Sequence, residues 1–379
     1  MTTGLTFTNG QVVTGDARIA DRLHIDGSRI VAAPAGASGA TIDLEGGWLL
    51  PGFIDTQVNG GGGVLFNDDP SVETIRRIGA AHARFGTTAF LPTLISDTIE
   101  RIDQAMRATE QAIAAGVPGV VGIHIEGPFL NPARKGTHDA ARFLRLDAAA
   151  IALLGSLATG RTMVTLAPEM TTPDDIRALV RAGVIVSAGH TDADYPTMRD
   201  AFAAGVTGVT HLFNAMSPLH HREPGVVGAT LENQQAYAGL IVDGRHVAPA
   251  ALRIALAARP RTRFMLVTDA MSPVGTDADH FDLQGKTIRI ENGVCVEENG
   301  TLAGSALDMA AAVRNAVEML GMTVAEAAIM ASSAPAAFLS LAGRGVLSPG
   351  GRADLVWLDA DLRPRGTWIG GLPVAITAG

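Results

Sequence analysis

The stretch Val184–Met216, VIVSAGHTDADYPTMRDAFAAGVTGVTHLFNAM, decides the fold that we predict for this chain. Its two apolar runs, Val184–Ala188 and Val206–Thr210, have the length and composition of buried parallel strands. Between them, Asp194–Ala204 has helical spacing and is followed by a glycine, which commonly ends a helix. A strand, a helix and a second strand in this order predict a βαβ unit with two parallel strands.

Each of these strands leads into a histidine, His190 after the first and His211 after the second. The carboxyl ends of parallel strands meet at one edge of a sheet, where α/β folds place their sites. One such histidine alone is best interpreted as a partner for a loop carbonyl. Two histidines at matched positions favour metal binding or catalysis.

The chain from 51 to 347 repeats this alternation of strand and helix. Helical patterns such as SVETIRRIGAAHARF and APAALRIALAAR separate the candidate strands, which are Gly52–Val58, Thr87–Thr93, Val120–Glu126, Thr162–Pro168, Val184–Gly189, Gly208–Leu212, Ala238–Asp243 and Phe264–Asp269. Eight such units predict a (β/α)₈ TIM-like barrel, a fold of the α/β class. An open, doubly wound sheet is the alternative.

The two ends of the chain differ from this middle part. Residues 1–50 alternate apolar and polar in short bursts, and residues 348–379 contain similar runs, ADLVWLD and GTWIGGLPVAI. We expect both ends to pair in one small β-sandwich domain, with the barrel of residues 51–347 inserted between them. The pairs in the first segment that are typical of hairpin turns are Asn9-Gly10 and Asp26-Gly27.

A further interruption follows the eighth candidate strand. The segment Asp282–Asn299, which contains KTIRIENGVCVEENG, predicts a β-hairpin. A long helical pattern comes next, with Leu307, Val313, Val317 and Leu320 on one face. Ser305 stands before it and is the expected N-cap.

Composition restricts the classes of function. A formal charge of −9 and an aromatic content of 4% disfavour nucleic-acid binding. The single cysteine, Cys295, excludes an intrachain disulfide and suits a reducing compartment. The first residues lack the pattern of a signal peptide, and no apolar run is long enough for a bilayer. We therefore expect a cytoplasmic protein with no membrane partner.

Polar side chains follow most of the candidate strands, and these are Gln57, Asn59, Thr93, Glu126, Glu169, His190, His211, Asp243, His246 and Asp269. Among them, Glu126, His190 and His211 supply one carboxylate and two imidazoles, the ligand set of a catalytic zinc site with an open position. Asp269, after the apolar run FMLVT, is well placed to take a proton from an attacking water. As a purely structural residue it would cap the following turn.

An anion site is expected after the sixth strand. Asn214 and Ala215 offer backbone N–H groups there, and Arg222 and His246 are the nearby cations. Without a ligand, Arg222 would be an ordinary exposed loop arginine. The glycines Gly60–Gly63 lack the Lys-Ser or Lys-Thr pair of a phosphate loop, and they predict a flexible rim turn instead.

Several motifs occur in the order of a known family, and these are PGFIDTQVNGGGG, HIEGPFLNPARKGTHD, SAGH, THLFNAMSPLHHREPG, VDGRHV, LVTDAM and LAGSAL. Over nearly its whole length the sequence therefore resembles the N-acetylglucosamine-6-phosphate deacetylases, a family of the amidohydrolase superfamily. HIEGPF and THLFNAM are specific to this family, whereas PGFID is shared across the superfamily.

The resemblance implies hydrolysis of the acetamide of N-acetyl-D-glucosamine 6-phosphate to D-glucosamine 6-phosphate and acetate. It implies that Glu126, His190 and His211 bind one divalent metal ion, Zn²⁺ first of all, with Fe²⁺, Mn²⁺ or Co²⁺ as alternatives. Asp269 would act as general base and then as general acid. His138, in the KGTH motif, would hold the amide carbonyl oxygen.

The resemblance also implies where the sugar phosphate binds. The residues matched to substrate-binding positions are His138, Asn214, Ala215, Arg222, His246, Leu302, Ala303 and Ser305. Arg222 would reach the neighbouring subunit of a homodimer.

One feature departs from the wider superfamily, where a His-x-His pair follows the first strand. Here the pair is Gln57-x-Asn59, and amides are poor metal ligands beside imidazole, so we expect one metal ion instead of two. The same pair disfavours a cyclic amidase such as a dihydroorotase. Another phosphorylated N-acetylamino sugar, such as the galactosamine epimer, stays open as the substrate, because sequence does not reveal the orientation of one hydroxyl. A non-catalytic scaffold is disfavoured because the metal ligands and Asp269 are all present.

Overall fold

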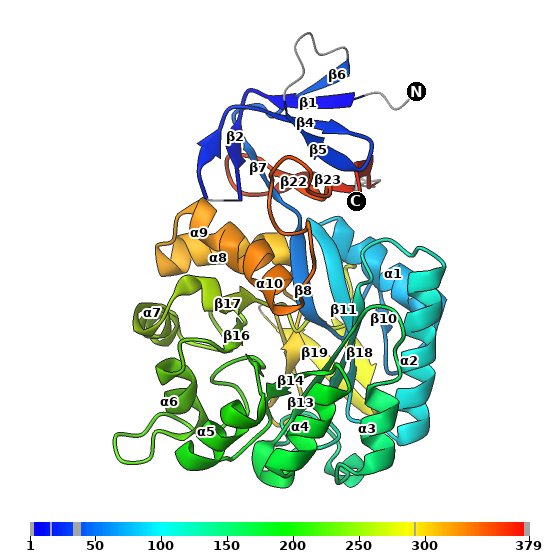
Figure 1. Ribbon diagram of the computed structural model, residues 1–379, viewed down its shortest axis with the longest axis vertical. Coiled ribbons are helices and arrows are strands. Elements are labelled where there is room, and N and C mark those ends of the chain that lie inside the picture. The colour runs from blue at the N-terminus through cyan, green and yellow to red at the C-terminus, as the bar shows by residue number, and fades with distance from the viewer. Residues whose placement is uncertain (1–3, 16, 33–38, 292, 375–379) are drawn as a thin grey trace.

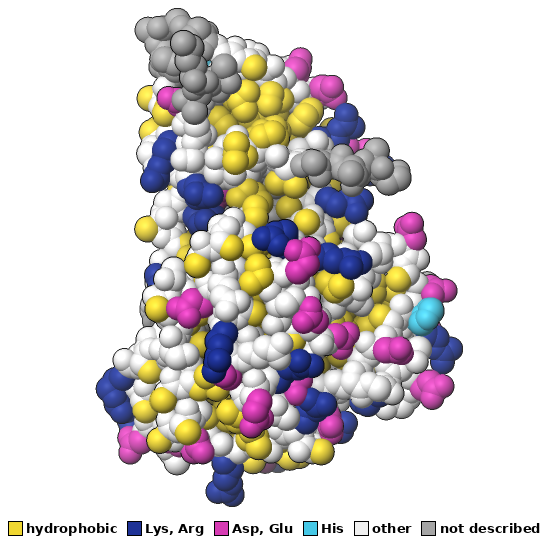
Figure 2. Space-filling view, turned by 90° about the vertical axis from the view of Figure 1, so that its right-hand side faces the viewer, with side chains coloured by type: hydrophobic (Ala, Val, Ile, Leu, Met, Phe, Trp, Pro, Cys, Tyr) yellow, Lys and Arg dark blue, Asp and Glu magenta, His cyan; other side chains and the backbone are white. Residues whose placement is uncertain are grey.

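The structure is a computed structural model that describes residues 4–15, 17–32, 39–291 and 293–374. Figure 1 shows a larger part, in which helices surround a group of strands, and a smaller β part at one end. The smaller part contains both the first and the last described strands. On the face that Figure 2 shows, acidic and basic side chains are interspersed, and no large basic patch is visible there.

The described residues include eight parallel strands in one sheet, in the order β17-β16-β15-β14-β13-β12-β11-β8. Their bounds are β8 (Phe53–Val58), β11 (Thr87–Ile95), β12 (Gly122–Glu126), β13 (Arg161–Leu166), β14 (Ile185–Ala188), β15 (Gly208–Val209), β16 (Tyr237–Leu240) and β17 (Phe264–Leu266). The two outer strands join, because the N–H of Asp269 donates to the carbonyl of Gln57 over 3.0 Å and Val58 bridges Ala270. The predicted barrel is confirmed, and the open sheet is wrong.

Helices cover the outside of this barrel (Figure 1). Their bounds are α1 (Val72–Ala83), α2 (Ile99–Ala114), α3 (Ala148–Leu154), α4 (Pro173–Arg181), α5 (Tyr195–Ala204), α6 (Gly225–Glu232), α7 (Pro249–Ala258), α8 (Met309–Leu320), α9 (Val324–Ala328) and α10 (Ala334–Phe338). Short helical turns are η1 (Pro132–Arg134), η2 (Ala140–Arg142), η3 (Pro168–Met170), η4 (Arg261–Arg263) and the π-helical η5 (Ile329–Ser333). No helix of the described residues has the length and apolar content needed to cross a membrane.

Helix α5 shows how the sequence sets these boundaries. The side chain of Asp194 accepts a hydrogen bond from the N–H of Thr197, which satisfies a donor that the first turn leaves unpaired. At the other end, Gly205 has a φ of 118°, a conformation that glycine adopts without strain. The helix predicted over Asp194–Ala204 is therefore present, with its N-cap and its C-cap glycine.

Three barrel strands end earlier than the apolar runs predict. We expected them to reach Leu212, Asp243 and Asp269, but β15 ends at Val209, β16 at Leu240 and β17 at Leu266. The backbone turns into the left-handed region at His211, with a φ of 32°, and at Asp269, with a φ of 52°. A strand cannot continue through such a residue, and the conformation costs roughly 1–2 kcal/mol for a residue with a Cβ.

The smaller part consists of two sheets, with the orders β5-β4-β1-β6 and β24-β23-β22-β7-β2-β3. Its strands are β1 (Gly4–Thr8), β2 (Gln11–Val13), β3 (Ile19–Ala20), β4 (Leu23–Asp26), β5 (Arg29–Val31), β6 (Gly39–Asp43), β7 (Trp48–Pro51), β22 (Leu355–Leu358), β23 (Pro364–Ile369) and β24 (Leu372–Pro373). Strand β7 pairs antiparallel with β22, which joins the two ends of the chain. The sheets face each other across a shared apolar core, where Phe7 meets Trp368 edge-to-face at 5.0 Å.

One of the two predicted hairpin turns is wrong. Strands β1 and β2 flank Asn9-Gly10 but do not pair with each other; β1 pairs with β4 and β6, and β2 with β3 and β7. The turn carries the chain from one sheet to the other, and a Cβ at Gly10 would lie 2.6 Å from the Cβ of Leu44. The turn at Asp26-Gly27 does join the antiparallel strands β4 and β5, as predicted.

The segment after β17 forms an antiparallel sheet of β18 (His280–Leu283), β19 (Lys286–Glu291), β20 (Val294–Val296) and β21 (Leu302–Ser305). The predicted hairpin is its β19–β20 pair. A second small sheet holds β9 (Gly60–Gly61) and β10 (Val64–Leu65). Ser305 is not the N-cap of the following helix, because it lies in β21 and its hydroxyl donates to the carbonyl of Thr268. The N-cap of α8 is Asp308, which accepts from the N–H of Ala311.

The burial of His82 should make the free energy of unfolding depend on pH. Its buried Nε2 lies 2.8 Å from the carbonyl of Gly60, which can only accept, so Nε2 carries the proton; Nδ1 has no partner in the described part of the chain. Burial lowers the pKa of His82 to about 4, below the unfolded value near 6.5. As pH falls from 6.5 to 4, the unfolded chain binds a proton that the folded chain does not. The free energy of unfolding should therefore fall by at most about 3 kcal/mol from this group.

Denaturant unfolding at pH 7 and pH 4.5 measures this effect. His82→Gln keeps an N–H for the Gly60 carbonyl but does not titrate, so it should lose less stability between the two pH values than the wild type. His280→Gln is the control, since His280 is exposed. Equal pH dependence of His82→Gln and the wild type would contradict the prediction.

Candidate functional site

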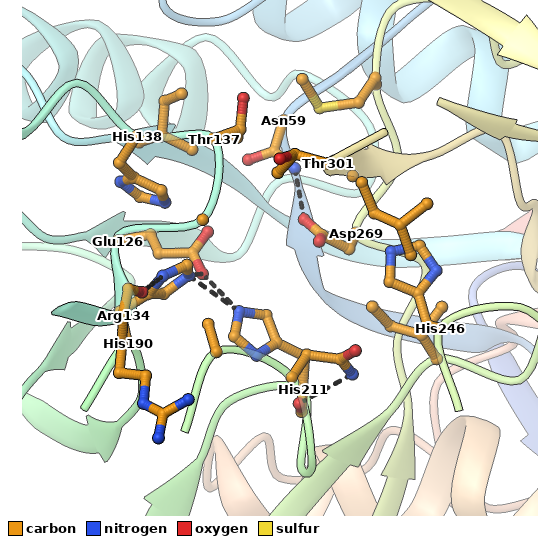
Figure 3. A pocket seen from close by; sticks show the side chains of 18 of the residues that line it. Asn59, Glu126, Arg134, Thr137, His138, His190, His211, His246, Asp269 and Thr301 are labelled. Carbon is orange, nitrogen blue, oxygen red and sulfur yellow. Dashed lines mark hydrogen bonds and ion pairs between the residues drawn. The ribbon is translucent and has the colours of Figure 1, made fainter. Parts of the chain in front are cut away.

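Three side chains from the carboxyl ends of three barrel strands meet at one edge of the sheet. Glu126 ends β12, and His190 and His211 follow β14 and β15. The Oε1 of Glu126 lies 3.0 Å from the Nε2 of His211 and 3.3 Å from the Nε2 of His190, and the two nitrogens are 3.1 Å apart. All three side chains are buried. Figure 3 shows both rings turned toward the carboxylate.

This triangle fits a single metal ion. Ligand atoms about 2.1 Å from a tetrahedral zinc ion lie roughly 3.4 Å from one another, close to the three distances here. Another trio of described residues, Glu126, His138 and His190, has ligand atoms within 4.8 Å of one another. Two ligands of one ion can be at most about 4.2 Å apart, and all three distances of the triangle with His211 are below that limit. In addition, the Nδ1 of His138 accepts from the backbone N–H of Ser96, so its Nε2 carries the proton and has no lone pair for a metal ion.

The ring of His190 is held in the tautomer that a metal ligand needs. Its Nδ1 lies 2.9 Å from the carbonyl oxygen of Arg134. Because a carbonyl can only accept, Nδ1 carries the proton, and the lone pair of Nε2 faces Glu126 and His211. The backbone of His190 is also left-handed, with a φ of 47°. Strained residues of this kind persist where the surroundings fix them, often at functional sites.

Two amides bind the two carboxylates of the site. The Nδ2 of Asn59 donates to the Oδ1 of Asp269 over 2.7 Å. The Nε2 of Gln57 lies 3.1 Å from that same oxygen and 3.1 Å from each carboxylate oxygen of Glu126. Gln57 and Asn59 therefore act as hydrogen-bond donors toward Glu126 and Asp269, which supports the prediction of one metal ion.

Asp269 has the electrostatics of a base. Burial and the nearby charge of Glu126 raise the pKa of Asp269 to about 6. A base is most effective when its pKa lies close to the working pH, and this carboxylate is still ionised at pH 7. The two amides occupy Oδ1, so the second oxygen of Asp269 is the one suited to receive a proton.

His138 is positioned by Ser96, which the sequence did not single out. Its Nδ1 lies 2.8 Å from the hydroxyl of Ser96 and 3.4 Å from the backbone N–H of the same residue. The N–H can only donate, so Nδ1 accepts and Nε2 carries the proton. Burial and the neighbouring His190 hold the pKa of His138 well below its usual range. His138 is thus a neutral N–H donor beside the ligands, with its ring 4.4 Å from that of His190.

These residues surround a cavity of about 320 Å³, a size suited to a small ligand. It is lined by Asn59, Ile95, Glu126, Ala133, Arg134, Gly136, Thr137, His138, His190, His211, Asn214, Ala215, Ile241, His246, Asp269, Met271, Thr301, Leu302 and Gly304. His246 is held by Asp243, since its Nδ1 lies 2.6 Å from the Oδ2 of that carboxylate. Figure 3 places its ring on the same side of the cavity as Asp269.

Two residues expected at the sugar pocket do not line this cavity. Ala303 and Ser305 are buried on the other face of β21, because successive side chains of a strand point to opposite sides. Leu302, the third residue expected there, does line the cavity, and so does Gly304. A Cβ on Gly304 would lie 2.6 Å from the side chain of Met271, so only glycine fits there without a shift.

The predicted anion donors are also only partly available. The backbone N–H of Asn214 donates to the carbonyl of His211, so it is not left for an anion. Its side-chain Nδ2 donates to the same carbonyl over 3.1 Å and lies 3.5 Å from the carbonyl of Leu212. Arg222 is exposed and lies outside the cavity, in a neighbouring groove that it shares with Arg134. Ala215 and His246 do line the cavity. Arg134, at the end of η1, and Thr137, in the KGTH motif, also line the cavity, but no local pattern marked them.

Comparisons with known proteins place this geometry in a family. Residues 48–374 match the Amidohydrolase family. A Shewanella sp. (strain ANA-3) protein named N-acetylgalactosamine-6-phosphate deacetylase is 46% identical over 329 residues, which are 86% of this chain and 83% of that relative. A Haemophilus influenzae protein named N-acetylglucosamine-6-phosphate deacetylase is 37% identical over 335 residues, 87% of each chain.

A solved structure gives the same result. The crystal structure of N-acetylglucosamine-6-phosphate deacetylase from Pasteurella multocida has a TM-score of 0.94 and 34% identity, and the match covers 98% of this chain and 99% of that one. The chain therefore belongs to the amidohydrolase family, in the group that contains the N-acetylglucosamine-6-phosphate and N-acetylgalactosamine-6-phosphate deacetylases.

Proposed function

We propose that this protein hydrolyses the acetamide of N-acetyl-D-glucosamine 6-phosphate, releasing acetate and D-glucosamine 6-phosphate. The observation that carries the proposal is the triangle of Glu126, His190 and His211 beside Asp269 in a cavity of suitable size. The names of the relatives, which match most of the chain, support this substrate class.

Glu126, His190 and His211 would hold one divalent metal ion, for which zinc suits the two nitrogens and one oxygen. When bound, such an ion polarises the amide carbonyl and brings the pKa of a coordinated water to about 7. Asp269 takes the proton from the attacking water and later gives it to the leaving amine. His138 donates its Nε2–H to the carbonyl oxygen as negative charge develops, a contribution often near 3 kcal/mol.

The phosphate would bind at the side of the cavity formed by Ala215 and His246. Arg222 does not line the cavity of its own chain, so we expect it to contact the phosphate bound to a second copy, as a homodimer would allow. The mass of the protein in solution, measured by light scattering, tests this arrangement. The buried free thiol of Cys295 is compatible with a reducing, cytoplasmic location.

A second candidate substrate is N-acetyl-D-galactosamine 6-phosphate, which the 46% identity to the Shewanella relative favours. Acetate release from the two epimers, and from N-acetylglucosamine without phosphate, separates the alternatives. We expect kcat/KM to be at least about tenfold higher for the glucosamine epimer than for the galactosamine epimer, and lowest for the sugar without phosphate. The reverse order of epimers would support the second candidate. No release from either phosphate would overturn the proposed function.

A further inference from the structure

Glu169 is a strand-end carboxylate that the proposed mechanism does not use. It lies in η3, directly after β13, and its side chain does not line the cavity. Its Oε1 accepts from the Nδ2 of Asn131 over 2.8 Å and from the N–H of Asp192 over 2.6 Å, and its Oε2 accepts from the hydroxyl of Thr191 over 2.5 Å. Throughout the described ranges, no lysine or arginine forms an ion pair with it. Its partners are uncharged donors from two separate loops.

The first of these loops leads to the ring of His190. The N–H of Asn131 donates to the carbonyl of His190 over 3.0 Å. The side chain of Asn131 also caps η1 by accepting from the N–H of Ala133. The last residue of η1 is Arg134, whose carbonyl accepts the proton of the His190 ring. Glu169 thus holds Asn131, the N-cap of η1, and the last residue of η1 orients the ring of His190.

The second loop is the backbone that follows His190. Thr191 and Asp192 come directly after the left-handed residue and give a hydroxyl and an N–H to Glu169. A backbone in this region relaxes toward φ below zero unless its surroundings hold it. The three hydrogen bonds of Glu169 therefore act on both sides of one ligand, on its ring and on its main chain.

We infer that Glu169 is a positioning residue that fixes His190 for metal binding by joining the loop after β12 to the loop after β14. This inference rests on the proposed metal site. Groups that orient ligands from outside the metal's own contacts typically change metal affinity or activity on the order of 10- to 100-fold. Glu169 contacts neither the cavity nor the ligand atoms, so its replacement should change metal affinity and ligand geometry before it changes substrate binding.

The test compares Glu169→Ala, Glu169→Gln and the control Asp175→Ala. Asp175 is another hydrogen-bonded carboxylate, which caps α4 together with Thr172 and contacts neither loop. Zinc affinity is measured by competition with a chromophoric chelator. The visible spectrum of the cobalt-loaded protein reports ligand geometry, and the Tm of the metal-free protein reports stability.

Glu169→Ala should weaken zinc binding about 10- to 100-fold and alter the cobalt spectrum. Glu169→Gln should restore most of both, because its Oε1 can accept from Asn131 and Asp192 and its Nε2 can donate to the Thr191 hydroxyl. Asp175→Ala should lower Tm but leave zinc affinity and spectrum as in the wild type. Should Glu169→Ala fail to fold, Thr191→Val should give a smaller change in the same direction. It removes one of the three donors to Glu169, together with the acceptor of the Ala193 N–H.

Wild-type zinc affinity and spectrum in the folded Glu169→Ala variant, whatever its Tm, would overturn the inference and leave the proposed function intact. If only Thr191→Val folds, wild-type zinc affinity and a wild-type cobalt spectrum in that variant would likewise overturn the inference. A wild-type protein that bound neither zinc nor cobalt would overturn the proposed metal site, and this inference with it.

Discussion

Replacing Asp269 by Asn is expected to lower kcat on the order of 100- to 10,000-fold and to leave the metal content unchanged. The amide keeps the shape of the side chain and an oxygen for the Asn59 hydrogen bond, but it cannot take a proton. The pKa of Asp269 near 6 makes the carboxylate a competent base at neutral pH, so its loss should be felt in the chemical step. Steady-state kinetics and metal analysis on the same sample measure both quantities.

Asp277→Asn is the matched control for this substitution. Asp277 is exposed, eight residues further along the chain, and its variant should have wild-type kcat. Near-normal turnover of Asp269→Asn would assign the proton transfer to another group. Loss of the metal from that variant would instead show that Asp269 is a ligand.

Removal of the metal is expected to reduce turnover by a factor on the order of a thousand or more. Polarisation of a carbonyl by an ion is worth several kcal/mol, and about 4 kcal/mol corresponds to a thousandfold in rate. Dialysis against a chelator, followed by titration with zinc or cobalt, should restore activity fully at one ion per chain. We expect one ion per chain because the amide N–H groups of Gln57 and Asn59 donate to Glu126 and Asp269, and an N–H donor is not a metal ligand.

The control for this titration is Glu126→Gln, which removes one proposed ligand without changing the shape of the side chain. Added zinc should not restore its activity at concentrations that saturate the wild type. Undiminished turnover of metal-free wild-type protein would contradict the proposed mechanism. A requirement for two ions per chain would show that the amides do not prevent a second site.

The barrel and the meeting of Glu126, His190 and His211 could be predicted because both depend on local burial patterns. A strand buried on both faces is apolar throughout, and parallel strands bring their carboxyl ends to one edge. The positions where β15 and β17 end could not be predicted in this way. They depend on left-handed residues whose conformation is fixed by contacts with other loops.

Contacts between distant segments account for the other differences. Asn9-Gly10 is a common hairpin pair, but the choice of partners for β1 and β2 is made by strands far along the chain. Ser96 and His138 are also remote in sequence, and a serine after a strand has many possible roles. The motif LAGS located the correct strand, whereas the side that each residue faces depends on register, so Gly304 lines the cavity and Ala303 does not.

The pairing of β7 with β22 has a consequence for biosynthesis. A ribosome makes β7 before any part of the barrel, and its partner emerges only after the barrel is complete. Until then β7 has an unpaired edge, the kind of surface through which nascent chains associate with one another. Strand β22, which is made after the barrel, therefore closes an edge of β7 that has been open since before the barrel was made. The small sandwich can reach its final form only after the barrel has been synthesised.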